Sequence, residues 1–324
     1  MSYYDIDCNG VTPVIGTLLV VMVVFSIVGS ILIWGIPHFE RNKIKSLLEG
    51  VYSQLEILEE TLHELIYSDE KDVRESKLFI ETGNLYFKTS TDRMIFLYSY
   101  NSGYDFEIQG LNTIGKNFTL TMLQGICTHL NITWTSENGV TFSQTKPVMG
   151  NPSTVEVDRE IKGTVSIFLY NDTILFGRVE VFDFNSILYE LHSAFGTYKF
   201  FLNNGAIIVH YPINSSYLNS KPIVYKNKKI FSFHLIQLNS SKFLSGGGSL
   251  KYHFSINVIS HIIIENNKIS FLKIRIYGEN KYAWHNYLTR VLGFDDNLNY
   301  PITSNNISFV LAESFLNIRN NFIS

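Results

Sequence analysis

An uncharged, apolar run near the N-terminus constrains this chain more than any other feature of its sequence. The residues from Pro13 to Ile36 read PVIGTLLVVMVVFSIVGSILIWGI and include no Asp, Glu, Lys or Arg. At 1.5 Å per residue, a helix of about 24 residues is roughly 36 Å long, enough to cross the hydrocarbon core of a bilayer. Thr12 is placed to cap this helix, and Trp34 falls at interfacial depth. The sequence therefore predicts one transmembrane helix in contact with lipid.

The same run differs from a secretory signal peptide. Such peptides begin with positive charge and have a short apolar stretch, whereas the first ten residues here are MSYYDIDCNG and the apolar run is long. We therefore expect a retained anchor and a single-pass membrane protein.

Two features of the sequence favour opposite orientations of this helix. Arg41, Lys43 and Lys45 follow the apolar run, and the positive-inside rule would place that side in the cytoplasm, although the rule weakens for large translocated domains. Six Asn-x-Ser/Thr sequons favour an extracellular C-terminal part, but chance would supply roughly four in a chain of this composition. The sequons are candidate N-glycosylation sites and start at Asn117, Asn131, Asn171, Asn214, Asn239 and Asn306.

A helical stalk is predicted directly after the membrane segment. Its apolar residues alternate at spacings of four and three, which is a heptad pattern of about three repeats. They form a helix-packing seam made of Ile44, Leu48, Val51, Leu55, Leu58, Leu62 and Leu65. The seam could pack on the chain's own sheet, on the same helix of a neighbouring subunit, or on an unrelated protein. Pro37 is expected to kink or interrupt the helix, and the charged run 67–76 to end it.

Short apolar or alternating runs fill the chain beyond the stalk. Asn, Gly, Asp and Lys separate these runs, which predicts a mainly antiparallel, sandwich-like β ectodomain. Hairpin turns are expected at Asn171–Asp172 and at 266–268. Two segments have a helical pattern, 185–195 and 282–292, so one or two short helices are expected within the β domain.

The predicted organisation has three parts. Residues 1–10 form a leader, residues 11–67 the transmembrane helix and amphipathic stalk, and residues 68–324 a β-rich ectodomain. An uneven stretch before Pro152 suggests that the ectodomain divides into two subdomains near residue 151.

Charge and motifs exclude several classes of function. The net charge of −3 and pI near 6.3 provide no basic surface, so no nucleic-acid partner is expected. Two cysteines, Cys8 and Cys127, do not indicate a disulfide framework. The glycine-rich segment SGGGS has no following Lys-Ser/Thr, and the nine histidines have no metal-ligand spacing. We predict no catalytic, cofactor-binding or metal-binding residue, and treat the histidines as structural.

The N-terminus resembles a known family. Gly10 followed by VTPVIGTLLVV is similar to the start of archaeal type IV pilin-like proteins, the superfamily that includes archaellins. The resemblance implies a class III signal peptide cut by a prepilin peptidase between Gly10 and Val11, and a head outside the cell. The segments NGAIIVHYP, SGGGS and YAWHNYL also resemble parts of larger pilin-like proteins of archaea.

Some residues depart from the family pattern. No Lys or Arg precedes Gly10, and Ile15 stands where many pilins have Glu. A head of about 250 residues is also large for a major subunit. The resemblance therefore implies a minor pilin, a pseudopilin or a stand-alone surface protein, with other pilin-like subunits as partners through the helix.

Two alternatives to this non-enzymatic surface protein belong to other classes. The first is a membrane-tethered extracellular module that binds a ligand or glycan through its aromatic-rich head and enters no filament. The second is a tethered hydrolase with a dispersed site, which would require His and carboxylate side chains to converge in one cleft.

Overall fold

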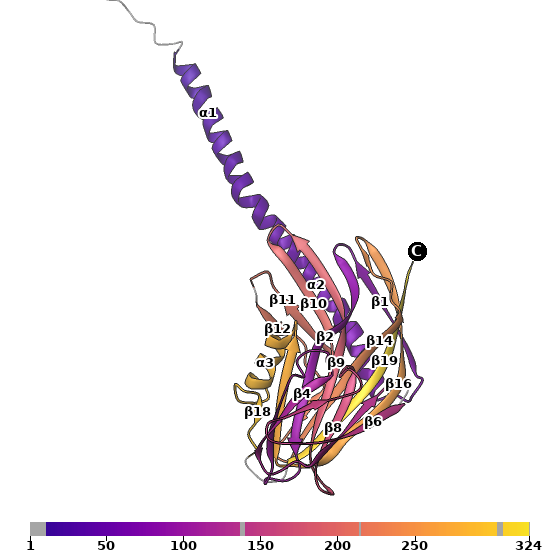
Figure 1. Ribbon diagram of the computed structural model, residues 1–324. Helices are drawn as coiled ribbons and strands as arrows, with labels where there is room; N and C mark the ends of the chain where they lie inside the picture. The colour runs from indigo at the N-terminus through magenta and orange to yellow at the C-terminus, as the bar shows by residue number, and fades with distance from the viewer. Residues whose placement is uncertain (1–10, 137–139, 214, 303–306, 324) are drawn as a thin grey trace, which may run out of the picture. The chain divides into compact units, whose positions relative to one another are not determined.

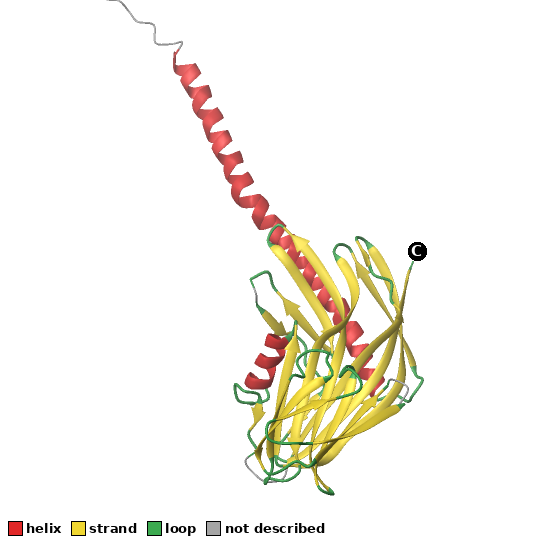
Figure 2. Ribbon diagram, viewed as in Figure 1, coloured by secondary structure: helices red, strands yellow, loops and turns green. Residues whose placement is uncertain are grey.

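The chain forms two units in the computed structural model, which describes residues 11–136, 140–213, 215–302 and 307–323. The two units meet between Val51 and Tyr52 in the sequence, and each has its own internal contacts. The N-terminal unit is helical, with α1 (Val11–Ser30), the π-helical turn η2 (Ile31–Gly35) and the first part of α2 (Ile36–Ile66). Residues 52–324 form the β-rich unit, in which most residues lie in strands (Figure 2).

The predicted apolar helix is confirmed. The helical stretch that begins at Val14 is long and apolar enough to cross a membrane, and no side chain between Val14 and Ile36 is buried. A lone apolar helix with every large side chain exposed would be unstable in water, because its apolar surface has no protein partner. The helix is consistent with a single-pass membrane protein.

A π-helical turn lies where the sequence predicted an interruption by proline. Pro37 has no N–H to donate to the carbonyl of Ile33, so the regular i to i−4 ladder cannot continue through it. The N–H of Ile36 instead bonds to the carbonyl of Ile31, the spacing of a π turn. The helix therefore continues beyond Pro37 as α2 and ends at Ile66, immediately before the charged run.

Three sheets build the β-rich unit (Figure 1). The first sheet has the order β1 (Val73–Ile80), β16 (Leu250–Ile269), β19 (Ile307–Phe322), β14 (Ile230–Lys242) and β13 (Val224–Lys226). The main path of the second sheet is β12 (Ser216–Leu218), β11 (Ala206–His210), β10 (Gly196–Asn203), β9 (Ile174–Ser193), β2 (Asn84–Ser99), β17 (Phe271–Gly278) and β18 (Asn299–Tyr300). Its remaining strands are β15 (Gly246–Gly247) on β2, β8 (Thr164–Asn171) on β9, β5 (His129–Thr135) on β8, and β6 (Thr141–Pro147) on β5. The third sheet comprises β3 (Asp105–Gln109), β4 (Asn117–Gln124) and β7 (Ser153–Glu156).

The strands pair as the sequence predicted, mainly antiparallel. Among the described residues the exception is β14 with β19, which run parallel. The predicted turn at Asn171–Asp172 joins β8 to β9, and Asp172 adopts a φ of 51° there. The predicted C-terminal helix is confirmed as α3 (Lys281–Arg290), which packs its Trp284 into the core.

The second sheet has apolar side chains buried on both faces. In β2, Met94 and Phe96 join a core with the first sheet, whereas Ile95 and Leu97 join a core with the third sheet. The ring centroids of Phe96 and Phe233, from the second and first sheets, are 5.4 Å apart. Burial on both faces explains why the segment RMIFLYS is an unbroken apolar run rather than an alternating one.

Two local predictions are wrong. The segment 185–195 was expected to be helical, but Asn185–Ser193 forms the end of β9, hydrogen-bonded to β10. Both faces of this stretch are buried, so its sequence lacks the strict alternation of a strand, and tertiary pairing overrides helix propensity. The expected turn at 266–268 lies inside β16, where Asn266 opposes Val310 of β19, and the chain turns only at Ser270. The pairing of β16 with β19 holds these polar residues in an extended conformation.

The last part of α2 packs within the β-rich unit. Four residues of the predicted seam are fully buried there: Leu55, Leu58, Leu62 and Leu65. The ring of His63 lies 2.6 Å from the carbonyl oxygen of Gly205, measured from Nε2. Gly205 has a φ of +65°, and a Cβ there would lie 2.5 Å from Ile236 Cδ1 and 3.1 Å from His63 Nε2, so a larger residue would have to displace these side chains. The other seam residues, Ile44, Leu48 and Val51, belong to the N-terminal unit.

Histidines connect the end of α2 to the first sheet. The hydroxyl oxygen of buried Ser314 lies 2.7 Å from both His234 Nε2 and His261 Nδ1, and His261 Nε2 lies 3.1 Å from the carbonyl oxygen of Ser68. A carbonyl only accepts, so His261 donates from Nε2, accepts from Ser314 at Nδ1, and His234 donates to Ser314. Burial lowers the pKa of His234 to about 4, which keeps this ring neutral near pH 7.

A buried ionic cluster joins the first and second sheets. Arg178 of β9 lies 2.5 Å from Glu180 and 3.1 Å from Glu265 of β16. The hydroxyls of Ser166 and Tyr98 donate to Glu180 and Glu265, at 2.5 and 3.1 Å. All three charged side chains are almost fully buried, so the single guanidinium provides the positive charge that two carboxylates need in this core.

A third buried carboxyl makes stability depend on pH. Glu313 of β19 accepts a hydrogen bond from Thr164 at 2.8 Å, and burial raises its pKa to about 8. A folded-state pKa above the unfolded value contributes stability that is complete below about pH 4.5 and is lost as the pH rises through 8. We expect Glu313→Gln to remove this loss. The difference in free energy of unfolding between the variant and the wild type should then increase by about 1 kcal/mol per pH unit between pH 5 and 8, in favour of the variant.

Urea denaturation of the full chain in detergent micelles at several pH values measures this difference. Glu64→Gln, at an exposed position of α2, is the matched control and should leave the pH dependence unchanged. A constant difference between Glu313→Gln and the wild type over this range would contradict the prediction.

Candidate functional site

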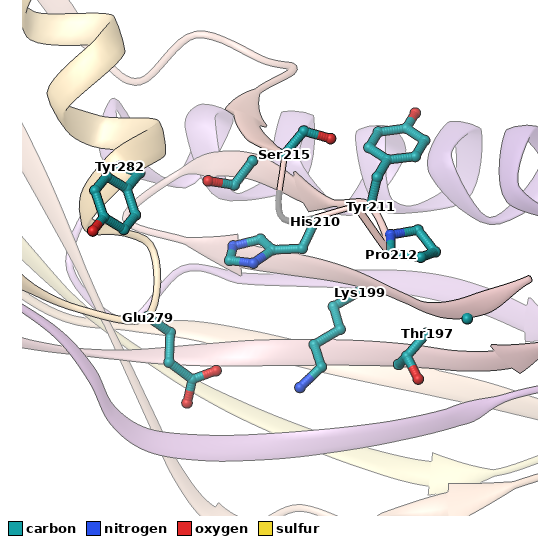
Figure 3. Close-up of a pocket in the computed structure, with 10 residues that line it drawn as sticks. Thr197, Lys199, His210, Tyr211, Pro212, Ser215, Glu279 and Tyr282 are labelled. Carbon is teal, nitrogen blue, oxygen red and sulfur yellow. The ribbon is translucent and has the colours of Figure 1, made fainter.

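A pocket of ≈ 800 Å³ lies in the β-rich unit at the junction of β10, β11, β12 and α3. This volume is within the range of roughly 300–1,000 Å³ found for small-molecule sites. Figure 3 shows the side chains that surround it. Its lining consists of Gly196, Thr197, Lys199, His210, Tyr211, Pro212, Ser215, Ser216, Glu279 and Tyr282.

Strand register places the polar floor of this pocket. Lys199 of β10 opposes Glu190 of β9 on one side and His210 of β11 on the other, and His210 in turn opposes Ser216 of β12. Directly opposed residues of a sheet point to the same face. The four side chains therefore form one row across four neighbouring strands.

A chain of hydrogen bonds fixes the orientation of His210. Asp92, which is buried, accepts from the backbone N–H of Asn280 at 2.9 Å and from its Nδ2 at 2.6 Å. Because Asn280 donates through Nδ2, its Oδ1 is left to accept, and this atom lies 2.7 Å from His210 Nε2. Nε2 must therefore carry the hydrogen, and Nδ1 of the neutral ring keeps a lone pair as a hydrogen-bond acceptor.

Burial shifts the pKa values of the groups at both ends of this chain. It lowers the pKa of His210, and it raises the pKa of Asp92 to about 6, against the opposing hydrogen bonds from Asn280. At pH 7 the imidazole is therefore neutral and the carboxyl mainly ionised.

The charged side chains around the pocket are paired with one another. Lys199 lies 3.3 Å from Glu190, and Glu279 accepts a hydrogen bond from Lys88. These four charges sum to zero. The two charged residues that line the pocket, Lys199 and Glu279, are opposite in sign, and each is paired with an oppositely charged side chain.

Tyrosines form the apolar part of the pocket wall. Tyr282 of α3 is 66% exposed, although it lines the pocket. Tyr211 stacks on Tyr217 with the planes 15° apart, and their hydroxyl oxygens are 3.0 Å from each other. Aromatic rings with a polar tip suit a ligand that is partly apolar and partly hydrated.

The tautomer of His210 is testable by NMR. We expect ¹⁵N chemical shifts to show the Nε2–H form in the wild type, because Asn280 Oδ1 can only accept. Asn280→Ala removes that acceptor, and the two tautomers should then exchange. His253, which lies 3.3 Å from Glu75 on another sheet, is the internal control and should not respond. The Nδ1–H form in the wild type would contradict the assignment.

Among the described residues, Val11 and the sequon asparagines Asn117, Asn131, Asn171 and Asn239 do not line this pocket, whereas Ser215 and Ser216, which follow Asn214 in its sequon, do. Gly10 lies outside the described residues, and Val11 is the first residue of α1, so cleavage between them stays a prediction. Asn214 and Asn306 also lie outside the described residues. Asn117 is exposed at the start of β4, whereas Asn131 lies in the middle of β5 between β6 and β8, with its side-chain oxygen buried.

The two remaining sequons are intermediate in exposure. Asn171 donates from Nδ2 to the hydroxyl of Tyr104 at 3.0 Å, and Asn239 is half-buried in β14. Glycosylation requires an accessible amide nitrogen, so Asn117 is the described sequon that best fits the prediction.

Sequence reasoning missed the pocket but had marked two of its segments. NGAIIVHYP supplies His210, Tyr211 and Pro212, and YAWHNYL supplies Tyr282. Lys199 and Glu279 gave no local signal, since charged residues beside strands are common. In the part of the chain that the structure describes, no group of three or more His, Cys, Asp or Glu is placed to hold a metal ion. Comparisons with protein-family models, with curated proteins and with solved structures found no match.

Proposed function

We propose that this chain is a membrane-anchored, pilin-like surface protein, namely a minor pilin, a pseudopilin or a stand-alone cell-surface protein with an extracellular, sandwich-like β unit. The division of one helical stretch into two parts carries the proposal. Its N-terminal part is apolar with exposed side chains, and its C-terminal part buries four leucines within the β-rich unit. The first part suits lipid or the helices of other subunits, and the second fixes the β unit to its stalk.

Protease added outside intact cells tests the orientation. We expect it to remove the β-rich unit, and mass spectrometry of the membrane-extracted protein to find Val11 as the mature N-terminus. A β unit that stays intact until the cells are opened would support the orientation favoured by Arg41, Lys43 and Lys45. That result would overturn an extracellular function, and a mature N-terminus upstream of Val11 would count against the pilin-like processing.

The pocket favours a second candidate function, a tethered module that binds a ligand and enters no filament. It brings together a neutral imidazole, hydroxyls and exposed tyrosines, which are groups suited to binding. Replacing residues 14–36 by an unrelated transmembrane helix separates the two candidates. Filament assembly should fail under the first, because subunit helices must pack on one another, whereas ligand binding should persist under the second.

A hydrolase receives less support. His210 and Glu279 do line one cleft, as a dispersed hydrolytic site requires. However, among the described residues the ring of His210 is hydrogen-bonded to Asn280 and to no hydroxyl. His210 is therefore not paired with a hydroxyl nucleophile, and the lining hydroxyl of Thr197 lies 2.9 Å from Nδ1 of His192 instead.

A further inference from the structure

We propose that the pocket between β10, β11, β12 and α3 binds an uncharged saccharide. The inference rests on the second candidate function, a ligand-binding β unit, and names the class of its ligand. Three independent properties of the pocket lead to it: its compensated charge, its mixture of hydrogen-bond donors and acceptors, and its exposed tyrosine.

The compensated charge disfavours ionic ligands. A bound anion would meet Glu190 beside Lys199 and Glu279 beside Lys88, and a bound cation would meet the lysine of each of these two pairs. An ion that enters such a pocket loses hydration without gaining an unpaired counter-charge, and this desolvation is unfavourable. A neutral polar ligand does not incur that cost.

The hydrogen-bonding groups match sugar hydroxyls. Nδ1 of His210 can only accept, because the chain from Asp92 through Asn280 places the hydrogen on Nε2. Thr197 and Ser216 carry hydroxyls that donate and accept, and the ammonium of Lys199 only donates. A ligand hydroxyl both donates and accepts, so a polyhydroxylated ring can satisfy all these groups, whereas a purely accepting or purely donating ligand cannot.

The exposed tyrosine provides a surface for the apolar face of a sugar ring. A pyranose has hydroxyls around its edge and C–H groups on its faces, and an aromatic ring can pack on such a face while its own hydroxyl stays hydrated. Tyr282 is suited to this role because it is 66% exposed yet lines the pocket. Nζ of Lys281 lies 4.8 Å from the centroid of this ring, but exposed cation–π contacts are weak, about 0.5–1 kcal/mol.

Saturation-transfer NMR on the full chain tests the proposal, in micelles of a detergent whose headgroup is not a sugar. The probes are glucose, cellobiose, lactose and diacetylchitobiose, with glucuronate and glucosamine as charged counterparts of one ring. We expect at least one neutral probe to bind, and glucuronate and glucosamine to bind at least tenfold more weakly than that probe. Tyr282→Ala should weaken binding of the neutral probe about tenfold. Tyr225→Ala should leave that binding unchanged, because Tyr225 is 59% exposed and lies outside the pocket.

Glu279→Gln sharpens the charge argument. It leaves Lys88 without its carboxylate partner, so the affinity for glucuronate should rise relative to the neutral probe. The inference is overturned if no neutral probe binds, if a charged probe binds more tightly to the wild type, or if Tyr282→Ala and Tyr225→Ala behave alike. Since the purified chain is used, these results do not depend on the orientation of the protein in the membrane. If outside protease removes the β-rich unit but no sugar binds, the saccharide inference is overturned and the extracellular orientation is not.

Discussion

Replacing Arg178 with Met is expected to destabilise the β-rich unit by roughly 3–5 kcal/mol, because breaking a buried ion pair leaves uncompensated charge. The side chain is 11% exposed and contacts Glu180 and Glu265, which are both buried. Met replaces the unbranched apolar stem of Arg and removes the guanidinium, so the variant loses the charge and its hydrogen bonds but keeps most of the stem's packing. Urea denaturation of the full chain in detergent micelles, followed by tryptophan fluorescence, measures the change.

Two further variants identify the cause. Arg159→Met, at an exposed arginine that lies 3.8 Å over the ring of Phe142, should change stability by less than about 1 kcal/mol. Combining Arg178→Met with Glu180→Gln and Glu265→Gln should restore much of the lost stability, since no buried charge then lacks a partner. If Arg178→Met costs no more than Arg159→Met, the ionic cluster is not what joins the two sheets.

Truncating Leu62 to Ala should cost about 2–5 kcal/mol, the range for large-to-small changes in packed cores. Leu62 is fully buried where α2 packs within the β-rich unit. The matched control is Ile57→Ala on the same helix, where the side chain is 54% exposed. Ala has a higher helix propensity than Ile, so this control should be neutral or slightly stabilising.

The comparison of Leu62 with Ile57 also tests how the seam is used. If the leucines served only contacts between subunits, Leu62→Ala would reduce assembly and leave the urea midpoint of the β-rich unit unchanged. A loss of stability for Leu62→Ala alone would show that this part of the seam belongs to the chain's own fold.

The pocket and the membrane helix make separate contributions to the proposed function. In the proposal, the helix holds the chain in the membrane, and it is long and apolar enough for that role. In the proposed binding module, the pocket supplies the ligand contacts, through His210, Lys199 and Tyr282. Variants of the pocket should therefore leave membrane attachment unchanged.

The sequence by itself determined the features that depend on local pattern. An unbroken apolar run is enough to predict that Pro13 to Ile36 forms a helix long and apolar enough to cross a membrane, because length and hydropathy are local properties. The 3.6-residue period likewise predicted α3, and turn-forming residues predicted the hairpin at Asn171–Asp172. Mainly antiparallel pairing followed from short runs separated by turn residues.

Only the tertiary structure decided the features that depend on distant pairing. Residues 185–193 form the end of a strand because β2 and β10 flank them, which their own sequence does not encode. The contact of Arg178 with Glu265 and the convergence of Lys199, His210 and Glu279 join positions that are far apart in the chain. Strand register and the connections between distant strands bring these residues together. A single sequence lists the residues but does not show which of them pair.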